Sequence, residues 1–482
     1  MTAEEEVVYL RKEKSLLQEQ LVQRDELIAQ MQQEMARLRE QVQALQEQLN
    51  KDSHNSHLPP STDRFHRQPK SLRPKSEKKP GGQPGHGGST LLLSPAPDVV
   101  LVHPVESCLH CQQDLREVES LQVERRQVID LPPKRVVVIE HQAEQKCCPR
   151  CQQISAASFP DDVRAPVQYG AALGAVGVYL VQQQLLPYER ACEVIEDLLG
   201  PAMSVGTLVG LVERCAEQLA PVEQQIKAAL SRAEVLHQDE TGLYVAGKCH
   251  WMHVSATEHL THYAVHPKRG KEALDAIGIL ADFDGVSVHD GWRSYWQFLC
   301  QHALCNVHHL RELTFLEEEQ RQAWAAEMKE LLLDIKAAVE QARAQGRSCL
   351  HPLEVADWKA RYELLLAEGY QANPPNPPPA TSKKGRRKQS AARNLLDRLS
   401  KHQQAVLLFL DNFAVPFDNS LAERDIRMVK VQQKVSGCFR SEAFAVAFCR
   451  IRGYLSTLRK QGLTVLPALE QTLVGHPVSP AF

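Results

Sequence analysis

The sequence predicts a multidomain α/β protein, and three observations lead to this prediction. A chain of 482 residues is longer than a typical single domain of ~100–200 residues, and 43% of its residues are hydrophobic, enough for several cores. Helical patterns at both ends enclose a central stretch in which short β-strand patterns alternate with a helix. A cysteine-rich segment precedes that stretch. We therefore expect several folded parts in series.

Composition excludes some classes of protein. The net charge is only -3, and no apolar run is long enough to span a membrane, so we expect no membrane partner. The N-terminus is rich in Glu and does not resemble a signal peptide. The 13 cysteines are odd in number and scattered, which is typical of a reducing compartment. These features predict a cytoplasmic protein, and DNA binding would make it nucleoid-associated.

Residues 1–50 are predicted to form a coiled coil. Apolar residues repeat every seven positions along two seams, which is the pattern of helices that pair. Lys14 and Arg24 interrupt the seams, and a polar seam residue often sets the register of a pair. A parallel dimer is favoured, and the alternative is one long solvated helix. The seams are Val7, Leu21, Ile28, Met35, Val42 and Leu49, and Leu10, Leu17, Met31, Leu38 and Leu45.

Residues 51–98 read as a basic linker rich in Pro and Gly. Such a composition cannot bury a core, and it includes the run GGQPGHGG from Gly81 to Gly88. Two interpretations stay open, a plain linker and a segment that follows the phosphate backbone of DNA. The basic residues are Arg64, Arg67, Lys70, Arg73, Lys75, Lys78 and Lys79.

Residues 99–160 are predicted to form a zinc ribbon. Cys108 and Cys111 make one C-x-x-C knuckle, and Cys148 and Cys151 make a second. Two such knuckles bring four thiolates to one tetrahedral, structural Zn²⁺. A strand is expected between them over residues 135–140, which read RVVVIE.

Residues 161–230 are predicted to be helical. One helix opens near Leu186 and ends near Gly200, and Ser204 is expected to cap the next. A helix, a short turn with Gly and a second helix are typical of a helix-turn-helix that binds DNA. A packed helical hairpin without DNA contact gives the same pattern.

A ribonuclease-H-like core is predicted for residues 231–316 and 412–465. Strands are expected over 235–244, 249–255 and 260–265, then a helix from Lys271, then a strand over 286–290. In that order the first strand is central and the fourth lies beside it. Residues 317–411 are predicted as a helical insertion with a basic, Pro-rich loop, and residues 466–482 as a tail.

Three carboxylates stand out in this core. Asp239 lies on the first strand, Asp290 ends the fourth, and Glu423 lies on a helix. Carboxylate oxygens are ligands for hard cations, and two Mg²⁺ ions, with Mn²⁺ as a substitute, clamp both oxygens of an in-line phosphoryl transfer. The alternative is that these are ordinary surface acids. Cations at helical spacing after Glu423 favour a polyanionic substrate, and we assign DNA contacts to Arg424, Arg427, Lys430 and Lys434.

The motifs as a set resemble those of the insertion-sequence 66 family of transposases. The resemblance runs over nearly the whole chain, from the coiled coil and knuckles through HQDETGLY, HDGWRSY, CNVHHLREL and DNSLAERDIR. It implies a DDE-type mechanism, a ribonuclease-H-like fold, Mg²⁺, DNA ends as substrate, and an acidic triad at Asp239, Asp290 and Glu423. The family usually has two adjacent asparagines where this chain has Asn419 and Ser420.

The resemblance places a C-x-x-H element on Cys305 and His308. We expect these residues to pack or to position DNA, because a second zinc site would need more ligands. Cys300, His302 and His309 are near in sequence.

The function expected from all this is a transposase that cleaves inverted-repeat ends and joins them to target DNA. Its partners would be DNA, a second copy through the coiled coil, and small accessory proteins of the same element. Two alternatives stay open, a ribonuclease-H-like nuclease that cuts without joining, and a catalytically silent DNA-binding scaffold.

Overall fold

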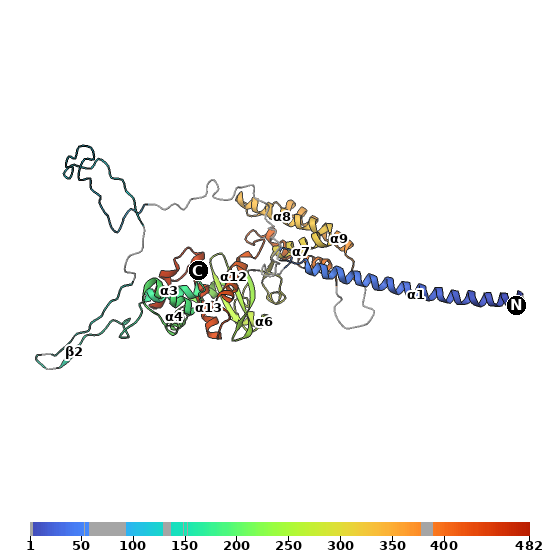
Figure 1. Ribbon diagram of the computed structural model, residues 1–482, viewed down its shortest axis with the longest axis horizontal. Helices are drawn as coiled ribbons and strands as arrows, with labels where there is room; N and C mark the ends of the chain where they lie inside the picture. Colours follow the sequence, from blue (N-terminus) through green and yellow to red (C-terminus); the bar gives the residue numbers. More distant parts are fainter. Residues whose placement is uncertain are drawn as a thin grey trace. The chain divides into compact units, whose positions relative to one another are not determined.

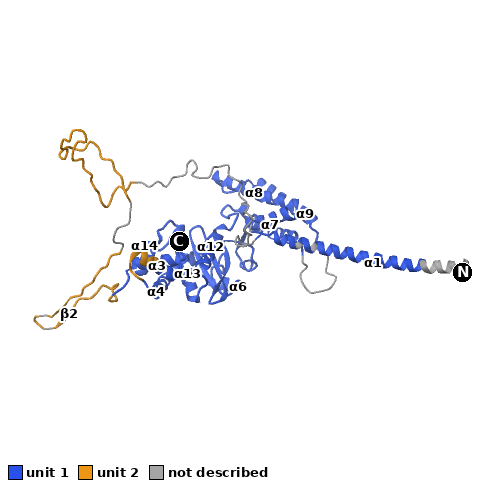
Figure 2. Ribbon diagram, viewed as in Figure 1, with its two compact units in different colours: residues 1–72, 167–192, 203–482 blue, residues 73–166, 193–202 orange. Residues whose placement is uncertain are grey.

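The computed structural model describes residues 3–52, 54–56, 93–128, 136–147, 149–151, 153–376 and 389–482. They belong to two compact units (Figure 2), residues 1–72, 167–192 and 203–482 in the first, and residues 73–166 and 193–202 in the second. Most of the predicted basic linker and the basic part of the predicted loop at 377–388 lie outside the described residues. Within the described ranges, no helix is both long and apolar enough to cross a membrane.

The N-terminal part of the first unit is one long helix, α1 (Ala3–Leu49) (Figure 1). The predicted helix is therefore confirmed. Many of its seam residues face solvent, for example Leu21 at 56% exposure and Met31 at 60%. These side chains are exposed among the described residues, and the helix alone leaves the predicted pairing untested.

The main folded part of the first unit is built on a five-stranded mixed sheet. Its strand order is β5-β4-β3-β6-β7, with β3, β4 and β5 antiparallel and with β6 and β7 parallel to β3. The predicted central first strand with the fourth strand beside it is confirmed. The strands are β3 (Val235–Val245), β4 (Lys248–Ala256), β5 (Thr261–His266), β6 (Val286–His289) and β7 (Gln301–Leu304), with α6 (Lys271–Ile277) between β5 and β6.

Two helices from late in the chain pack against the antiparallel half of this sheet. The helix α12 (Ser420–Ser436) contacts β3 and β4, and α13 (Glu442–Lys460) contacts β5. They share a core with the sheet in which Met252, Ile426 and Phe448 are buried. Gly453 permits the close approach of α13, because a Cβ there would lie 3.0 Å from the carbonyl oxygen of Thr261.

Five helices lie between β7 and α12 in the described residues. Helices α7 and α8 pack together, as do α8 and α9 (Figure 1), and α11 contacts β7. A second core, with Val288 of β6 and Leu313 of α7, joins these helices to the parallel half of the sheet. Helices over this stretch were predicted from the sequence. They are α7 (Asn306–Gln320), α8 (Ala323–Ala344), α9 (Pro352–Ala372), α10 (Ala391–Lys401) and α11 (Gln403–Asp411).

Helices are present from residue 171 onward within the predicted helical range 161–230, whereas residues 161–170 are not helical. As predicted, Ser204 caps α4, since its Oγ accepts a hydrogen bond from the Thr207 amide at 3.1 Å. Helix α4 contacts α2, α13 and α14, so its apolar face is buried. Its DNA-binding role stays a prediction. The helices are α2 (Ala171–Gln182), α3 (Tyr188–Leu199), α4 (Val205–Gln218) and α5 (Ala220–Leu230), with α14 (Val465–Leu473) at the end of the chain.

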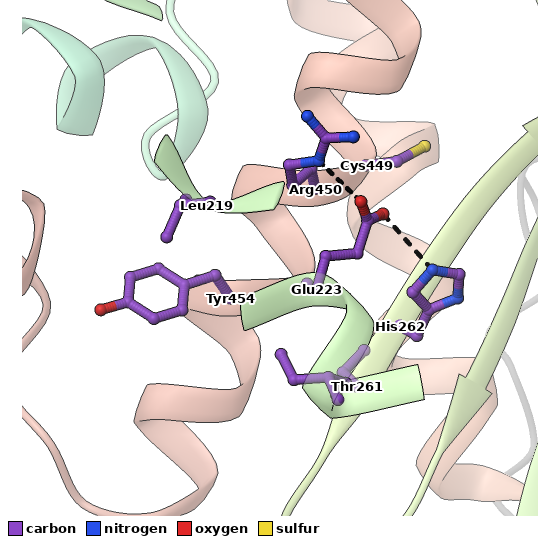
Figure 3. Close-up of a pocket in the computed structure, with 9 residues that line it drawn as sticks. Leu219, Glu223, Thr261, His262, Cys449, Arg450 and Tyr454 are labelled. Atoms are coloured by element: carbon purple, nitrogen blue, oxygen red, sulfur yellow. Dashed lines mark hydrogen bonds and ion pairs between the residues drawn. The ribbon is translucent and has the colours of Figure 1, made fainter. Parts of the chain in front are cut away.

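A small buried pocket lies where α5, β5 and α13 meet (Figure 3). Glu223 of α5 bonds Arg450 of α13 at 2.6 Å and lies 3.4 Å from His262 of β5. Burial by itself would raise the pKa of Glu223, but its bonds to these two partners lower the pKa overall. A largely buried carboxylate that bonds a guanidinium and an imidazole ties three elements together, so we regard this pocket as structural.

The cysteine-rich segment belongs to the second unit. Strands β1 (Gln145–Cys147) and β2 (Ile154–Ala156) form an antiparallel hairpin whose loop holds the second knuckle. The prediction of a strand over residues 135–140 is wrong for the part that the structure describes, residues 136–140. Val138 and Ile139 there are exposed and pair with no strand in the described residues, so the apolar run lacks the partner that would make it a strand.

Candidate active site

The pairing of β3 with β6 places two carboxylates side by side. The parallel register ends at the pair His237 and Val288. Asp239 lies two residues beyond His237, and Asp290 lies two residues beyond Val288. The two aspartates therefore occupy equivalent positions at the carboxyl ends of neighbouring parallel strands, where ligands of open α/β sheets bind.

Glu423 reaches the same edge from the first turn of α12. The residue before this helix, Asn419, is 1% exposed and fastens it to β3. Its Nδ2 donates to the Gln238 carbonyl at 2.7 Å, so its Oδ1 is left to accept from His237 Nδ1 at 2.9 Å. A buried carboxamide thus links the helix that carries Glu423 to the strand that carries Asp239.

The electrostatics of Asp239 include the charges of the other two carboxylates. Burial raises the pKa of Asp239 well above its usual range, and the adjacent charge of Glu240 raises it further. The charges of Asp290 and Glu423 contribute in the same direction. Carboxylates that repel one another in this way bind a divalent cation well, because the cation removes the repulsion.

Asp290 begins a short loop with several fixed contacts. Its Oδ1 accepts from the Trp292 amide at 2.8 Å. The next residue, Gly291, has φ +90°, a conformation that favours glycine, and its amide donates to His289 Nδ1 at 2.9 Å. Burial lowers the pKa of His289 well below its usual range, so the ring is neutral and accepts this bond. The loop geometry thus sets the direction of the Asp290 side chain.

A second buried carboxylate holds the same loop from the other side. Glu240 bonds the Arg269 guanidinium at 2.9 Å and accepts a short hydrogen bond from the Tyr295 hydroxyl. The Arg269 guanidinium also lies over the Trp292 ring, 3.8 Å from its centre. The sequence analysis did not name Arg269 or Tyr295. The two tryptophans and the tyrosine of the GWRSYW run were the signal that this loop packs against something.

The C-x-x-H element lies beside Glu423. Cys305 precedes α7 and is 1% exposed, and its Sγ lies 3.9 Å from Glu423 Oε1. His308 Nε2 lies 3.8 Å from the same oxygen. Burial raises the pKa of Cys305 to about 12, and the charge of Glu423 adds to this effect, so the thiol is protonated and donates. None of the candidates Cys300, His302 and His309 joins this group.

Residues 166–447 match the model of a family described as Transposase IS66 family. This range covers more than half of the chain and contains the carboxylates Asp239, Asp290 and Glu423. The chain belongs to the IS66 transposase family. A second model, of a family of unknown function (DUF6444), matches residues 5–91, and no curated protein matches the chain.

The IS66 transposase family implies DNA as a partner, and the basic residues predicted to contact DNA lie on α12. Arg424, Arg427, Lys430 and Lys434 are all exposed and recur at intervals of three or four residues, so they share one side of the helix. Lys430 is partly engaged, because its Nζ donates to the Gly242 carbonyl at 2.6 Å. This charged side begins one residue after Glu423.

The cysteine knuckles of this IS66 family member are described in part. Cys108 and Cys111 lie in a tight turn closed by a hydrogen bond from the Cys108 amide to the Gln113 carbonyl at 2.8 Å. Hydrogen bonds from Cys111 and His110 lower the pKa of Cys108, which favours the thiolate. Cys148 lies outside the described residues, so the four-cysteine zinc site stays a prediction.

Proposed function

We propose that this family member is a DDE-type transposase that cleaves the ends of its element and joins them to target DNA. The observation that carries the proposal is the equivalent register of Asp239 and Asp290 on β3 and β6, with Glu423 brought to the same edge by Asn419. The strand order β5-β4-β3-β6-β7 is the order expected of a ribonuclease-H-like core, and it supports the same proposal.

The three carboxylates fit a pair of Mg²⁺ ions. They offer hard oxygen ligands, and Asp239 carries an unfavourable charge that a cation would offset. Asp239, Asp290 and Glu423 would hold the ions. When bound, the ions would lower the pKa of the attacking water or 3′ hydroxyl and stabilise charge on the leaving oxygen. The protein would hold the phosphodiester in line through its fixed β-strands and through α12.

The basic side of α12 would hold the DNA phosphates. Arg424, Arg427, Lys430 and Lys434 are exposed, and phosphate contacts of this kind position the duplex without reading its sequence. Binding to DNA would make the protein nucleoid-associated. The affinity should fall steeply as salt rises, because each phosphate contact releases counterions.

The deciding experiment separates joining from cutting. Full-length protein is incubated with DNA carrying the flanking inverted repeats, Mg²⁺ and a target plasmid. Joined products support the transposase, and nicks alone support the nuclease. A protein that binds the ends but neither cuts nor joins them in Mg²⁺ or Mn²⁺ would be the silent scaffold.

We further propose that α1 pairs two copies of the chain. Its exposed seam residues, such as Leu21, Met31 and Leu45, need a partner, and a second α1 supplies the same pattern. Deleting residues 1–50 should weaken self-association and end pairing, while the sheet and its helices stay folded. Light scattering measures the first and circular dichroism the second. An unchanged oligomer after the deletion would show that α1 is not the main contact.

We also propose that Cys108, Cys111, Cys148 and Cys151 hold one structural Zn²⁺. Replacing Cys148 by Ser should remove about one zinc per chain, since a tetrahedral thiolate site seldom survives the loss of a ligand. Elemental analysis of the purified protein makes the measurement. Cys147→Ser is the matched control, because this neighbouring thiol belongs to neither knuckle. Equal zinc in Cys148→Ser and wild type would refute the assignment.

A further inference from the structure

A thiol, an imidazole and a carboxylate lie together at the N-terminal end of α7. Cys305 and His308 come from the start of this helix, and Glu423 comes from α12. One ligand atom of each lies within 4.8 Å of the others, and no other three His, Cys, Asp or Glu side chains in the described ranges have ligand atoms this close together. The sequence offered only two of these ligands. The fold supplies the third from more than a hundred residues away.

The distances suit a tetrahedral metal. Zn²⁺ binds sulfur at about 2.3 Å and nitrogen or oxygen at about 2.0–2.2 Å, so two ligands of one tetrahedron lie roughly 3.3–3.6 Å apart. Cys305 Sγ lies 3.9 Å from Glu423 Oε1, and His308 Nε2 lies 3.8 Å from it. The ligand atoms of Cys305 and His308 lie within 4.8 Å of each other, so side-chain movements of up to about an ångström would close the site.

The donor set selects the kind of ion. Mg²⁺ takes oxygen ligands and does not seek thiols, whereas sulfur and imidazole are ligands of Zn²⁺. Three protein ligands leave the fourth position for water, as in open zinc sites. The Asn419 amide already donates to Cys305 Sγ at 3.2 Å, a contact that would also stabilise a thiolate. The thiol proton would pass to solvent when the ion binds.

We propose that Cys305, His308 and Glu423 form a Zn²⁺ site, and that zinc bound there withdraws Glu423 from the magnesium site and inhibits the enzyme. The zinc site is independent of the proposed function, whereas the inhibition rests on it. Glu423 is then the residue for which the two metals compete. Zinc in this position acts as an inhibitor and has no structural role.

The first test counts zinc in the absence of DNA. Full-length protein and variants are dialysed against micromolar Zn²⁺, and the metal is measured per chain. Wild type should hold about one zinc more than Cys305→Ser, with binding to the remaining ligands at least ~100-fold weaker. His308→Gln should lose the same zinc. Cys300→Ser is the matched control, since Cys300 is also buried but lies outside the group, and it should keep wild-type zinc.

Two further measurements complete this test. The zinc lost in Cys305→Ser should add to the zinc lost in Cys148→Ser, because the two zinc sites are separate. Co²⁺ in place of zinc should give a thiolate-to-cobalt absorption in Cys148→Ser that disappears in the double variant with Cys305→Ser. Circular dichroism identifies any variant that fails to fold. If Cys305→Ser fails to fold, the zinc content of His308→Gln decides the test, because His308 is only partly buried. Equal zinc in wild type, Cys305→Ser and His308→Gln would overturn the proposal.

The second test measures competition between the metals. Cleavage of inverted-repeat DNA is followed at fixed Mg²⁺ with increasing free Zn²⁺, and each variant is compared with its own zinc-free rate. Half-inhibition of His308→Gln should need at least ~10-fold more zinc than half-inhibition of wild type. The same zinc sensitivity in both would refute the inhibition. Failure of wild type to cleave in zinc-free buffer would refute the proposed function and leave the zinc count standing.

Discussion

Replacing Asp239, Asp290 or Glu423 by its amide should abolish DNA cleavage and joining, while DNA binding persists. Each change removes an anionic ligand from a site that needs its full charge to hold hard cations. The phosphate contacts come instead from the arginines and lysines of α12. Gel shifts with inverted-repeat DNA measure binding, and strand-transfer assays measure chemistry. Joining by all three variants would refute the metal mechanism.

Protein stability supplies an independent check on Asp239→Asn. Burial, with the nearby negative charges, raises the folded pKa of Asp239 above its unfolded value. Such a group contributes its stability below the unfolded pKa and loses it as pH rises through the folded pKa. At pH 8 in EDTA, Asp239→Asn should therefore melt at or above the wild-type temperature. A lower melting temperature would mean that loss of activity reflects unfolding.

Glu240→Gln is the matched control for strand register. It follows Asp239 directly, so its side chain points to the other face of β3, where it meets Arg269 and Tyr295. Glutamine can still accept from Tyr295, so we expect a loss of stability and a milder loss of cleavage. If Glu240→Gln loses cleavage while Asp239→Asn keeps it, the catalytic carboxylate is Glu240, one residue later than assigned.

Asn419→Ala should destabilise the fold and also cost activity. The change leaves His237 Nδ1 and the Gln238 carbonyl buried without the Asn419 carboxamide, and each such loss costs about 1–3 kcal/mol, so about 2–6 kcal/mol in total. It also frees the start of α12, so the position of Glu423 relative to Asp239 becomes less well defined. Urea unfolding measures the first effect, and cleavage at saturating Mg²⁺ the second.

Two comparisons make the Asn419 prediction specific. Asn394 is an exposed asparagine on α10, and Asn394→Ala should change the free energy of unfolding little. In Asn419→Ala, the Mg²⁺ concentration needed for half-maximal cleavage should rise, because the ligand is displaced but not removed. Wild-type stability together with wild-type Mg²⁺ dependence would show that Asn419 does not fasten the helix.

The sheet was predictable because its local pattern is strong. Strand-forming residues at both ends of 235–244, such as Val235 and Tyr244, marked β3, and the order of strands and helix then indicated that β6 lies beside it. The same reasoning placed Asp239 near Asp290. The strand expected over residues 135–140 failed, because an apolar run becomes a strand only when another strand is available to pair with it.

What the sequence could not give were contacts between distant segments. Nothing local to Asn419 indicates that its carboxamide reaches β3, or that Glu423 stands beside Cys305 and His308. The partners of Glu240 are likewise set by tertiary packing. In each case the residue type is visible in the local sequence, but the residue that it contacts is set by the tertiary fold.

The distance along the chain between β3 and α12 has a consequence for synthesis. The bond between Asn419 and Gln238 joins residues 181 positions apart, and all of the helices α7 to α11 are made in between. A nascent chain therefore carries its sheet, with Asp239 and Asp290, well before Glu423 leaves the ribosome. If Glu423 holds a metal as proposed, prematurely terminated or proteolytically shortened products that lack α12 would be unable to cut DNA.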